Sequence, residues 1–261
     1  MNMLLAIDIG NTNVVIGIIS EGIIIDQWRL TTSHTRTRDE FWVTTNLLAM
    51  NAGIKTEEIK EVIISSVVPP LTNQFYLMAK KYLNKEAIIV RHDLPLEIEC
   101  LVDNPSELGA DRICNIFAAR DSYSLPQIVI DLGTATTFDI VDEKGRYLGG
   151  SIMPGIETAS FNLVEKAAKL PKFHLAFTDS VIGKNTIQHL QAGVMWGAVD
   201  QIDGMVKRIL SETNWKKCSV IATGGLAKLI ARHSNSISDV DSELTLHGLW
   251  KIFRKLQRQS S

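Results

Sequence analysis

Two short acidic glycine turns carry the residue types that a polyphosphate site needs. Asp8-Ile9-Gly10-Asn11-Thr12 follows the apolar run Leu4–Ile7, and Asp131-Leu132-Gly133-Thr134 follows Gln127–Ile130. Glycine lets backbone N–H groups approach a phosphate, Asn and Thr side chains donate hydrogen bonds, and a carboxylate can hold metal-bound water. We expect the two turns to clamp a phosphate chain and its metal ion from both sides.

Either turn alone is also explained by turn geometry, because Asp, Asn, Thr and Gly are common in hairpins. Their register favours a shared role. A shift of 123 positions places Asp8 on Asp131, Gly10 on Gly133 and Gly22 on Gly145. Two further hydroxyls, Thr136 and Thr137, follow the second turn.

A third glycine element is weaker evidence. Ser219–Ala222 reads as a strand that leads through Thr223-Gly224-Gly225-Leu226-Ala227 into a helix. Paired glycines there permit close approach of a ribose or a flat ring, or simply close packing. The sequence contains no G-x-x-x-x-G-K-[ST], G-x-G-x-x-G or H-E-x-x-H motif.

The elements around the turns repeat as well. Each half reads as a strand, an acidic glycine turn, a second strand, a hairpin and a third strand, followed by helices. The predicted strands are Leu4–Ile7, Asn13–Ile19 and Ile23–Leu30, then Gln127–Ile130, Thr136–Val141 and Tyr147–Ile152. The sequence therefore predicts a duplicated two-lobe α/β protein, with lobes at residues 1–122 and 123–261.

Helical patterns fill the remaining segments. The spacing of Leu71, Phe75, Met78 and Tyr82 predicts a helix that ends near Asn84. Asn104-Pro105-Ser106-Glu107 is typical of a helix start. Gln188–Leu210 reads as one long helix; its Gly193 and Gly197 each cost about 1 kcal/mol against alanine, which indicates a close approach by another helix or backbone.

Composition limits the function classes. Of 261 residues, 45% are hydrophobic and 21% charged, and the net charge of −2 argues against a nucleic-acid binder. Lys251–Arg258 alternates basic and apolar residues, as a solvated amphipathic helix does. No apolar run approaches the roughly 18 residues of a membrane span. The separated Cys100, Cys114 and Cys218 are expected to be buried thiols in a reducing cytoplasm.

Over nearly its whole length the chain resembles the type III pantothenate kinases, members of the actin/hexokinase/Hsp70-like ATPase superfamily. Besides the two turns, the motifs that carry the resemblance run along the chain as Arg29-Leu30-Thr31-Thr32, Ser65-Ser66-Val67-Val68-Pro69-Pro70, Asp103-Asn104-Pro105, Gly109-Ala110-Asp111-Arg112, Gly149-Gly150-Ser151-Ile152-Met153-Pro154-Gly155, Ile182-Gly183-Lys184-Asn185-Thr186 and Ala222-Thr223-Gly224-Gly225-Leu226-Ala227. The elements Gly109–Arg112 and Gly149–Gly155 distinguish this family from sugar and acetate kinases.

The resemblance implies a fold and a reaction. The fold would be α/β, a duplicated ribonuclease-H-like (actin-like ATPase) two-lobe fold with mixed sheets flanked by helices. The reaction would be ATP-dependent phosphorylation of pantothenate to 4′-phosphopantothenate, the first step of coenzyme A biosynthesis. The family uses Mg²⁺ with ATP and a monovalent cation, K⁺ or NH₄⁺. A cytoplasmic homodimer is implied, with no nucleic-acid or membrane partner.

The resemblance also implies roles for residues. Asp111 would be the general base, Arg112 would hold the pantothenate carboxylate, and Asp131 would bind the monovalent cation, while Asp8 lies on the Mg²⁺ side. ATP-binding positions fall on Asp8, Ile9, Gly10, Asn11, Thr12, Asn13, Val14, Val15 and Thr134. Substrate-binding positions fall on Val102, Gly109, Ala110, Asp111, Arg112 and Thr186.

Two features of the predicted acceptor site concern particular residues of this chain, the Asp111-Arg112 pair and Val102. Phosphoryl transfer needs little early proton transfer, so we expect Asp111 to work ionised, near its reference pKa of about 3.9. Asp111-Arg112 could instead be a solvated helical pair, but the adjacent Gly109 indicates that something approaches the backbone there. The family commonly has Tyr where this chain has Val102, and Leu101 could replace that contact.

Two other functions stay open at this level. A relative of the family could phosphorylate a different small hydroxy acid, which Val102 would suit. An ATP-driven switch, or a transcriptional accessory role proposed for relatives, is the non-enzymatic alternative. No helix-turn-helix signature and no basic face support that alternative.

Overall fold

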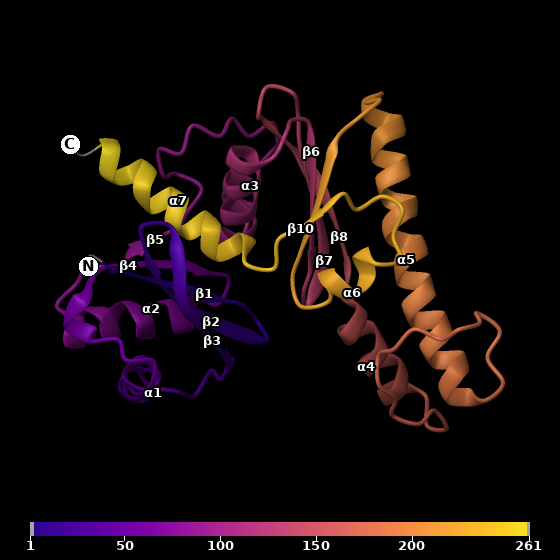
Figure 1. The fold of residues 1–261 in the computed structure, drawn as a ribbon, viewed down its shortest axis with the longest axis horizontal. Coiled ribbons are helices and arrows are strands. Elements are labelled where there is room, and N and C mark those ends of the chain that lie inside the picture. Colours follow the sequence, from indigo (N-terminus) through magenta and orange to yellow (C-terminus); the bar gives the residue numbers. More distant parts are fainter. Residues whose placement is uncertain (1–2, 260–261) are drawn as a thin grey trace. The chain divides into compact units, whose positions relative to one another are not determined.

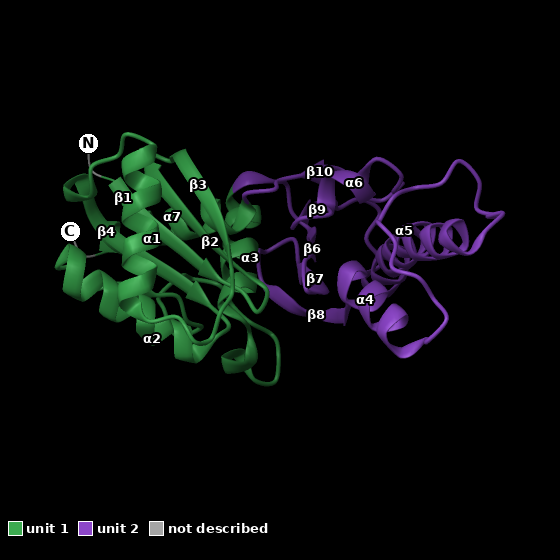
Figure 2. Cartoon of the chain, turned by 90° about the horizontal axis from the view of Figure 1, so that it is seen from below, with its two compact units in different colours: residues 1–121, 244–261 green, residues 122–243 purple. Residues whose placement is uncertain are grey.

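The computed structural model describes residues 3–259. The chain forms two compact units (Figure 2), Met1–Asp121 with Leu244–Ser261, and Ser122–Glu243. We call them unit 1 and unit 2. The predicted lobe boundary lies one residue from this division, but the predicted second lobe included residues 244–261, which belong to unit 1.

Unit 1 contains a five-stranded mixed sheet in the order β3-β2-β1-β4-β5 (Figure 1). Antiparallel β1, β2 and β3 are followed by β4 and β5, which are parallel to β1. The strands are β1 (Met3–Ile9), β2 (Asn13–Ser20), β3 (Ile23–Thr31), β4 (Ile59–Ser66) and β5 (Ile88–Ile89).

Helices cover both faces of this sheet. One face packs on α1 (Arg38–Asn51) and α2 (Pro69–Met78), and the other on α3 (Ala110–Ser122) and α7 (Leu244–Gln259). Strand alternation decides which residue faces which layer. In β1, Leu5, Ile7 and Ile9 pack towards α1 and α2, whereas Leu4 and Ala6 pack towards α3 and α7.

The apolar stripe of α7 explains its place in unit 1. Leu246, Leu249, Ile252 and Phe253 are buried in the same cluster as Leu4 and Ile63 of the sheet. An amphipathic helix follows the sheet face that buries its stripe, whatever its position along the chain. The amphipathic interpretation of Lys251–Arg258 is confirmed, whereas its assignment to the second lobe is not.

Unit 2 repeats the sheet. Its order is β10-β9-β6-β7-β8, so β6, β7, β8, β9 and β10 correspond in turn to β1–β5. The strands are β6 (Gln127–Leu132), β7 (Ala135–Val141), β8 (Tyr147–Pro154), β9 (Ser219–Thr223) and β10 (Asp239–Val240). The predicted duplication is confirmed by matching strand order and direction.

Three helices complete unit 2, α4 (Ile156–Lys166), α5 (Thr186–Thr213) and α6 (Ala227–Ala231). They pack on the sheet face that includes Ile128, Ile130 and Leu132 of β6. The long predicted helix is confirmed and extends at both ends. No neighbouring atom in the described chain lies within 4 Å of a methyl group at Gly193 or Gly197, so the close approach expected there is absent within the chain.

Short helices complete the fold: η1 (Thr56–Glu58), the π-helical turn η2 (Ala79–Leu83) that continues α2, and η3 (Pro105–Glu107). Asn84 ends the second in the left-handed conformation, as expected. Asn104 caps η3 by accepting from Ser106 N, but Leu108 is extended and α3 begins only at Ala110. The predicted helix start at Asn104 therefore produces one turn, and Gly109 separates it from α3.

Candidate active site

Asp8 lies at the carboxyl end of β1, on the sheet face that packs against α3. It shares this face with Leu4 and Ala6 because alternate strand residues point the same way. Its register partner on parallel β4 is Ser65, whose Oγ donates to Asp8 Oδ1 at 2.9 Å. The half-buried carboxylate is thereby held at the edge of the sheet.

The turn after Asp8 is closed by backbone and hydroxyl contacts. Gly10 N donates to Asn13 O at 2.9 Å, and Thr32 Oγ1 donates to Gly10 O at 2.7 Å. Thr32 N also donates to Thr12 O at 2.9 Å. Asn11 and Thr12 are exposed at the tip, where their side chains and backbone can meet a phosphate.

Two of the predicted ATP-binding residues have a different environment. Ile9 and Val14 are completely buried in the cluster under α1 and α2. They pair with each other across β1 and β2, so they anchor the turn from the core side and only their backbone can face a ligand. Asn13 and Val15 are half-buried.

The second turn is one residue tighter. Gly133 N donates to the carbonyl of Ala135, two residues further on, at 3.1 Å. Gly10 N donates instead to the carbonyl of Asn13, three residues further on. Leu132 pairs with Thr136, whereas Ile9 pairs with Val14. The 123-residue register therefore holds up to the two glycines and shifts by one immediately after them.

Asp131 lies near the carboxyl end of β6, beside two glycines. A methyl group at Gly224, whose φ is +91°, would lie 2.6 Å from Asp131 Oδ1, and one at Gly133 would lie 3.4 Å from it. The Gly-Gly element after β9 thus allows the Asp131 carboxylate to contact the backbone. The strand neighbours of Asp131 are Thr137 and Thr223.

Thr137 carries an orphaned polar atom next to Asp131. Its Oγ1 is buried and has no hydrogen-bond partner within the described part of the chain. A buried hydroxyl without a partner costs stability, so such a group commonly marks a site for water or an ion. Together with the Asp131 carboxylate it forms an all-oxygen donor set that suits a hard monovalent cation.

The remaining predicted residues of unit 2 are Thr134, in the turn between β6 and β7, and Thr186. The Thr134 carbonyl accepts from Gly155 N at 3.1 Å and Thr158 Oγ1 at 2.8 Å, so the turn is attached to the first turn of α4. Thr186 is exposed at the first position of α5, after Asn185, whose side chain accepts from Gln188 N at 3.0 Å.

Asp111 lies in the first turn of α3 in unit 1. Its Oδ1 accepts from Arg112 N at 2.8 Å, and a methyl group at Gly109 would lie 2.5 Å from the same oxygen. What approaches Gly109 is therefore the Asp111 carboxylate. Ala110 is buried, and Arg112 is half-buried.

The expected reference pKa of Asp111 is wrong. Burial raises the pKa of this carboxyl, against the backbone hydrogen bond from Arg112 and the charge of its guanidinium, which lower it. Desolvation penalises the charged form more than these two groups stabilise it. A raised pKa makes Asp111 a stronger base than a solvated aspartate.

The residue that departs from the family pattern, Val102, is half-buried, and the preceding Leu101 side chain is 48% exposed. Leu101 is therefore available to a ligand as an apolar surface. Thiol burial also differs from expectation. All three cysteines are free, but only Cys114 is buried, and Cys100 and Cys218 are partly exposed.

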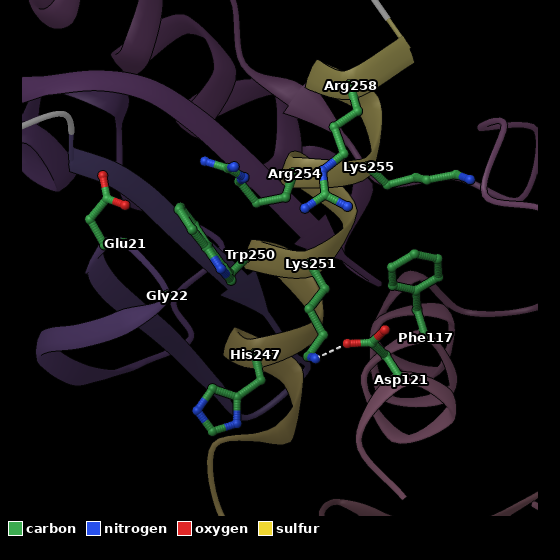
Figure 3. Close-up of a pocket in the computed structure, with 10 residues that line it drawn as sticks. All are labelled: Glu21, Gly22, Phe117, Asp121, His247, Trp250, Lys251, Arg254, Lys255 and Arg258. Atoms are coloured by element: carbon green, nitrogen blue, oxygen red, sulfur yellow. Dashed lines mark hydrogen bonds and ion pairs between the residues drawn. The ribbon is translucent and has the colours of Figure 1, made fainter.

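A separate hollow of about 490 Å³ lies over the polar face of α7 (Figure 3). Three of its cations have partners of their own: Lys251 pairs with Asp121, Lys255 with Glu97 at 2.6 Å, and the Arg254 guanidinium lies 5.5 Å from the Trp250 ring centroid. None of the predicted site residues lines it. This face agrees with the interpretation of a solvated helix.

Comparison with known proteins decides the family. A model of the type III pantothenate kinase family matches residues 4–208. The type III pantothenate kinase of Halalkalibacterium halodurans is 43% identical over 253 residues, which cover 97% of this chain and 99% of that protein. This chain belongs to the type III pantothenate kinase family. A second member, from Anaeromyxobacter dehalogenans, is 43% identical over 247 residues, covering 95% and 97%.

Solved structures agree at the level of the fold. A Campylobacter jejuni protein, provisionally described as a Baf family transcriptional activator, matches with a TM-score of 0.61 at 21% identity, covering 97% of this chain and 99% of that one. The activator of 2-hydroxyisocaproyl-CoA dehydratase from Clostridium difficile, solved with bound ADPNP, matches at 0.54 and 13% identity, covering 99% and 97%. This member of the kinase family thus has the duplicated ribonuclease-H-like, actin-like ATPase fold.

Sequence reasoning gave no role to several residues that hold this kinase's candidate site. Ser65 stands in one of the family motifs. Its position near the end of β4, a strand parallel to β1, is the signal that would have paired it with Asp8. Thr158 gave no signal. Cys114 lies three residues after Asp111, one helical turn away, and this spacing could have placed it on the same face.

Proposed function

We propose that this chain transfers the γ-phosphoryl group of ATP to the primary hydroxyl of pantothenate, forming 4′-phosphopantothenate and ADP. This reaction begins coenzyme A biosynthesis. The observation that carries the proposal is the placement of Asp8 and Asp111 around one buried group. The charges of both carboxylates act on the Cys114 thiol, so a phosphate-side acid and an acceptor-side acid converge on one region of unit 1.

Asp111 is the proposed general base. The hydroxyl oxygen of pantothenate bonds to the γ-phosphorus as the bond to the β,γ-bridging oxygen breaks, and the hydroxyl proton passes to Asp111. Such transfer depends mainly on positioning and charge neutralisation. Gly109 and Arg112 N fix Asp111 Oδ1, which leaves the carboxylate in a set orientation.

Arg112 is the proposed anchor for the pantothenate carboxylate. A guanidinium binds a carboxylate through two charge-assisted hydrogen bonds. Because Arg112 follows Asp111 directly, the anchor and the base are carried by the same turn of α3. Val102 and exposed Leu101, with Ala110 and Thr186, are the further acceptor contacts in this proposal.

Asp8 and the Gly10 turn are the proposed holders of Mg²⁺ and the ATP phosphates. Within residues 3–259, no group of three or more His, Cys, Asp or Glu side chains could hold a metal ion. A magnesium ion bound with ATP commonly uses only one or two carboxylates together with phosphate oxygens, so a single oriented carboxylate such as Asp8 fits it. The ion would neutralise phosphate charge.

The orphaned Thr137 hydroxyl supports a monovalent cation, K⁺ or NH₄⁺, at Asp131. We also propose that the protein is a cytoplasmic homodimer. No helix in the described part of the chain is long and apolar enough to cross a membrane.

A coupled assay with ATP, Mg²⁺ and K⁺ tests the function. Pantothenate-dependent ADP release is expected, with Asp111→Asn as the inactive control. A panel of small hydroxy acids runs in parallel, because Val102 could favour another acceptor; a better substrate than pantothenate would overturn the assigned acceptor. Salt-dependent DNA binding without kinase activity would support the switch instead.

A further inference from the structure

Ser65 of β4 holds the carboxylate of Asp8 and lies near the buried side chain of Cys114. Ser65 is completely buried, and its Oγ donates to Asp8 Oδ1 at 2.9 Å. The Cys114 thiol, which is also completely buried, lies close enough to Ser65 for the two side chains to interact. Cys114 belongs to α3, the helix that begins with Asp111.

The hydrogen bond between Ser65 and Asp8 has one possible direction. A serine hydroxyl has one hydrogen, which Ser65 gives to the Asp8 carboxylate. Burial, followed by the charges of Asp8 and Asp111, raises the pKa of the Cys114 thiol well above its usual range. The thiol therefore stays protonated at neutral pH and adds no charge beside the Asp8 carboxylate.

The backbone of Cys114 also packs against α7. A side chain at Gly248 of α7 would collide with the backbone carbonyl of Cys114, so α7 packs directly against the α3 backbone at this residue. On the same stretch of α3, Asn115 Oδ1 accepts from Thr245 Oγ1 at 2.8 Å. Helix α3 is thus fixed between α7 and the end of β4.

We propose that Ser65 is a positioning residue that orients the Asp8 carboxylate for MgATP, with the buried Cys114 side chain of α3 beside it. The inference rests on the proposed function of Asp8. It goes beyond that proposal because neither Ser65 nor Cys114 touches a substrate: each acts through the carboxylate that Ser65 holds.

The neighbouring serine provides a matched control. Ser66 follows on β4 and points the other way, towards α2, where its Oγ accepts from Thr72 Oγ1 at 2.7 Å and from Val68 N at 3.1 Å. Ser65→Ala and Ser66→Ala remove the same atom from adjacent residues. Only the first removes a hydrogen bond to Asp8.

The test combines kinetics, binding and thermal stability. For Ser65→Ala we expect kcat about ten-fold lower, the size expected for a hydrogen bond to a charged group, with half-activation shifted to higher Mg²⁺. The KM for pantothenate should stay within two-fold, because α3 keeps its place. Cys114→Ser should retain most activity, and the Ser65→Ala, Cys114→Ala pair should be no worse than Ser65→Ala.

Calorimetry measures MgATP binding in the absence of pantothenate. A wild type that binds MgATP without kinase activity would therefore contradict the proposed reaction and not this inference. Weaker MgATP binding by Ser65→Ala than by Ser66→Ala supports the positioning role. Equal binding and equal Mg²⁺ dependence in the two variants would overturn it, as would an equal loss of kcat at similar melting temperatures.

Discussion

The carboxylate of Asp111 lies against the α-carbon of Gly109, so that a methyl group at residue 109 would lie 2.5 Å from Asp111 Oδ1. No relaxed contact is that short, whereas the same methyl group would lie 3.4 Å from Val67 Cγ1, the next nearest side chain. Gly109 therefore sets the position of the proposed base.

Gly109→Ala should displace Asp111 and lower kcat by roughly ten-fold or more, the cost of a misplaced base. Steady-state kinetics measure this. The control is Gly53→Ala, which is strained by its φ of +73° but has no neighbour within 4 Å; it should lose stability and keep kcat. Wild-type kcat in Gly109→Ala would show that the carboxylate adapts and that Gly109 is not needed.

Asp111→Asn should lower the kinase activity and raise the free energy of unfolding at neutral pH. Burial raises the pKa of Asp111, so its ionisation costs folding free energy above that pKa. The amide removes this cost, and the variant should be more stable than the wild type at neutral pH. The difference should shrink as the pH falls through the raised folded pKa towards the unfolded value of about 3.9, because the wild-type carboxyl is then protonated in both states.

Activity of the same variant should fall about 10²- to 10⁴-fold. Denaturant unfolding at neutral and acidic pH, alongside the kinase assay, checks both halves. Lower stability than the wild type at neutral pH would contradict the desolvation account, since it would mean that the charge of Asp111 stabilises the fold.

Thr137→Val should separate cation binding from folding. The buried Thr137 Oγ1 has no hydrogen-bond partner among residues 3–259, so replacing it by an isosteric methyl should not destabilise the cation-free protein and should recover about 1 kcal/mol. The K⁺ concentration for half-maximal activity should rise, and the K⁺-induced increase in melting temperature should diminish.

Thr45→Val is the matched control for this change, because Thr45 Oγ1 in α1 is also buried without a partner in the described residues. It should match Thr137→Val in cation-free stability and keep the wild-type K⁺ dependence. Equal turnover of the wild type in Na⁺ and K⁺ would remove the cation from Asp131 altogether.

Local patterns were sufficient to predict much of the fold. Alternation and turn residues predicted the strands around both turns, and helical spacing predicted α2 and α5. These signals are local, so the sequence contains them in short windows. The lobe of α7 was not predictable in this way, because an apolar stripe such as Leu246, Leu249 and Ile252 indicates that a face is buried but not which sheet buries it.

Those parts of the candidate site that lie within one short segment of the sequence were predictable. The resemblance placed the Asp8 turn and Gly109–Arg112, but it could not show that Ile9 and Val14 face the core. The raised pKa of Asp111 and the Ser65 contact depend on packing between β1, β4 and α3, which are far apart in sequence. Such relationships are properties of the tertiary structure.

The glycines of α5 bear on the proposed homodimer. Gly193, Gly197 and Gly204 are spaced by four and seven residues, and Thr186 precedes the first by seven, so all four lie along one helix face. That face is opposite the buried Met195, Ala198 and Ile202, and a methyl group at any of the three glycines meets nothing within 4 Å. Because each glycine costs about 1 kcal/mol in a helix, the open stripe suits a second copy of the chain.

Gly197→Leu should therefore weaken self-association, because a large side chain prevents close helix packing. Light scattering across a dilution series should give a dimer for the wild type and a larger monomer fraction for the variant. Asn73→Leu, an exposed change on α2 and therefore away from α5, should remain dimeric. If the dimer uses this face, Gly197→Leu should also raise the KM for pantothenate, since Thr186 lies on it; a monomeric wild type, or a Gly197→Leu dimer of unchanged stability, would place any interface elsewhere.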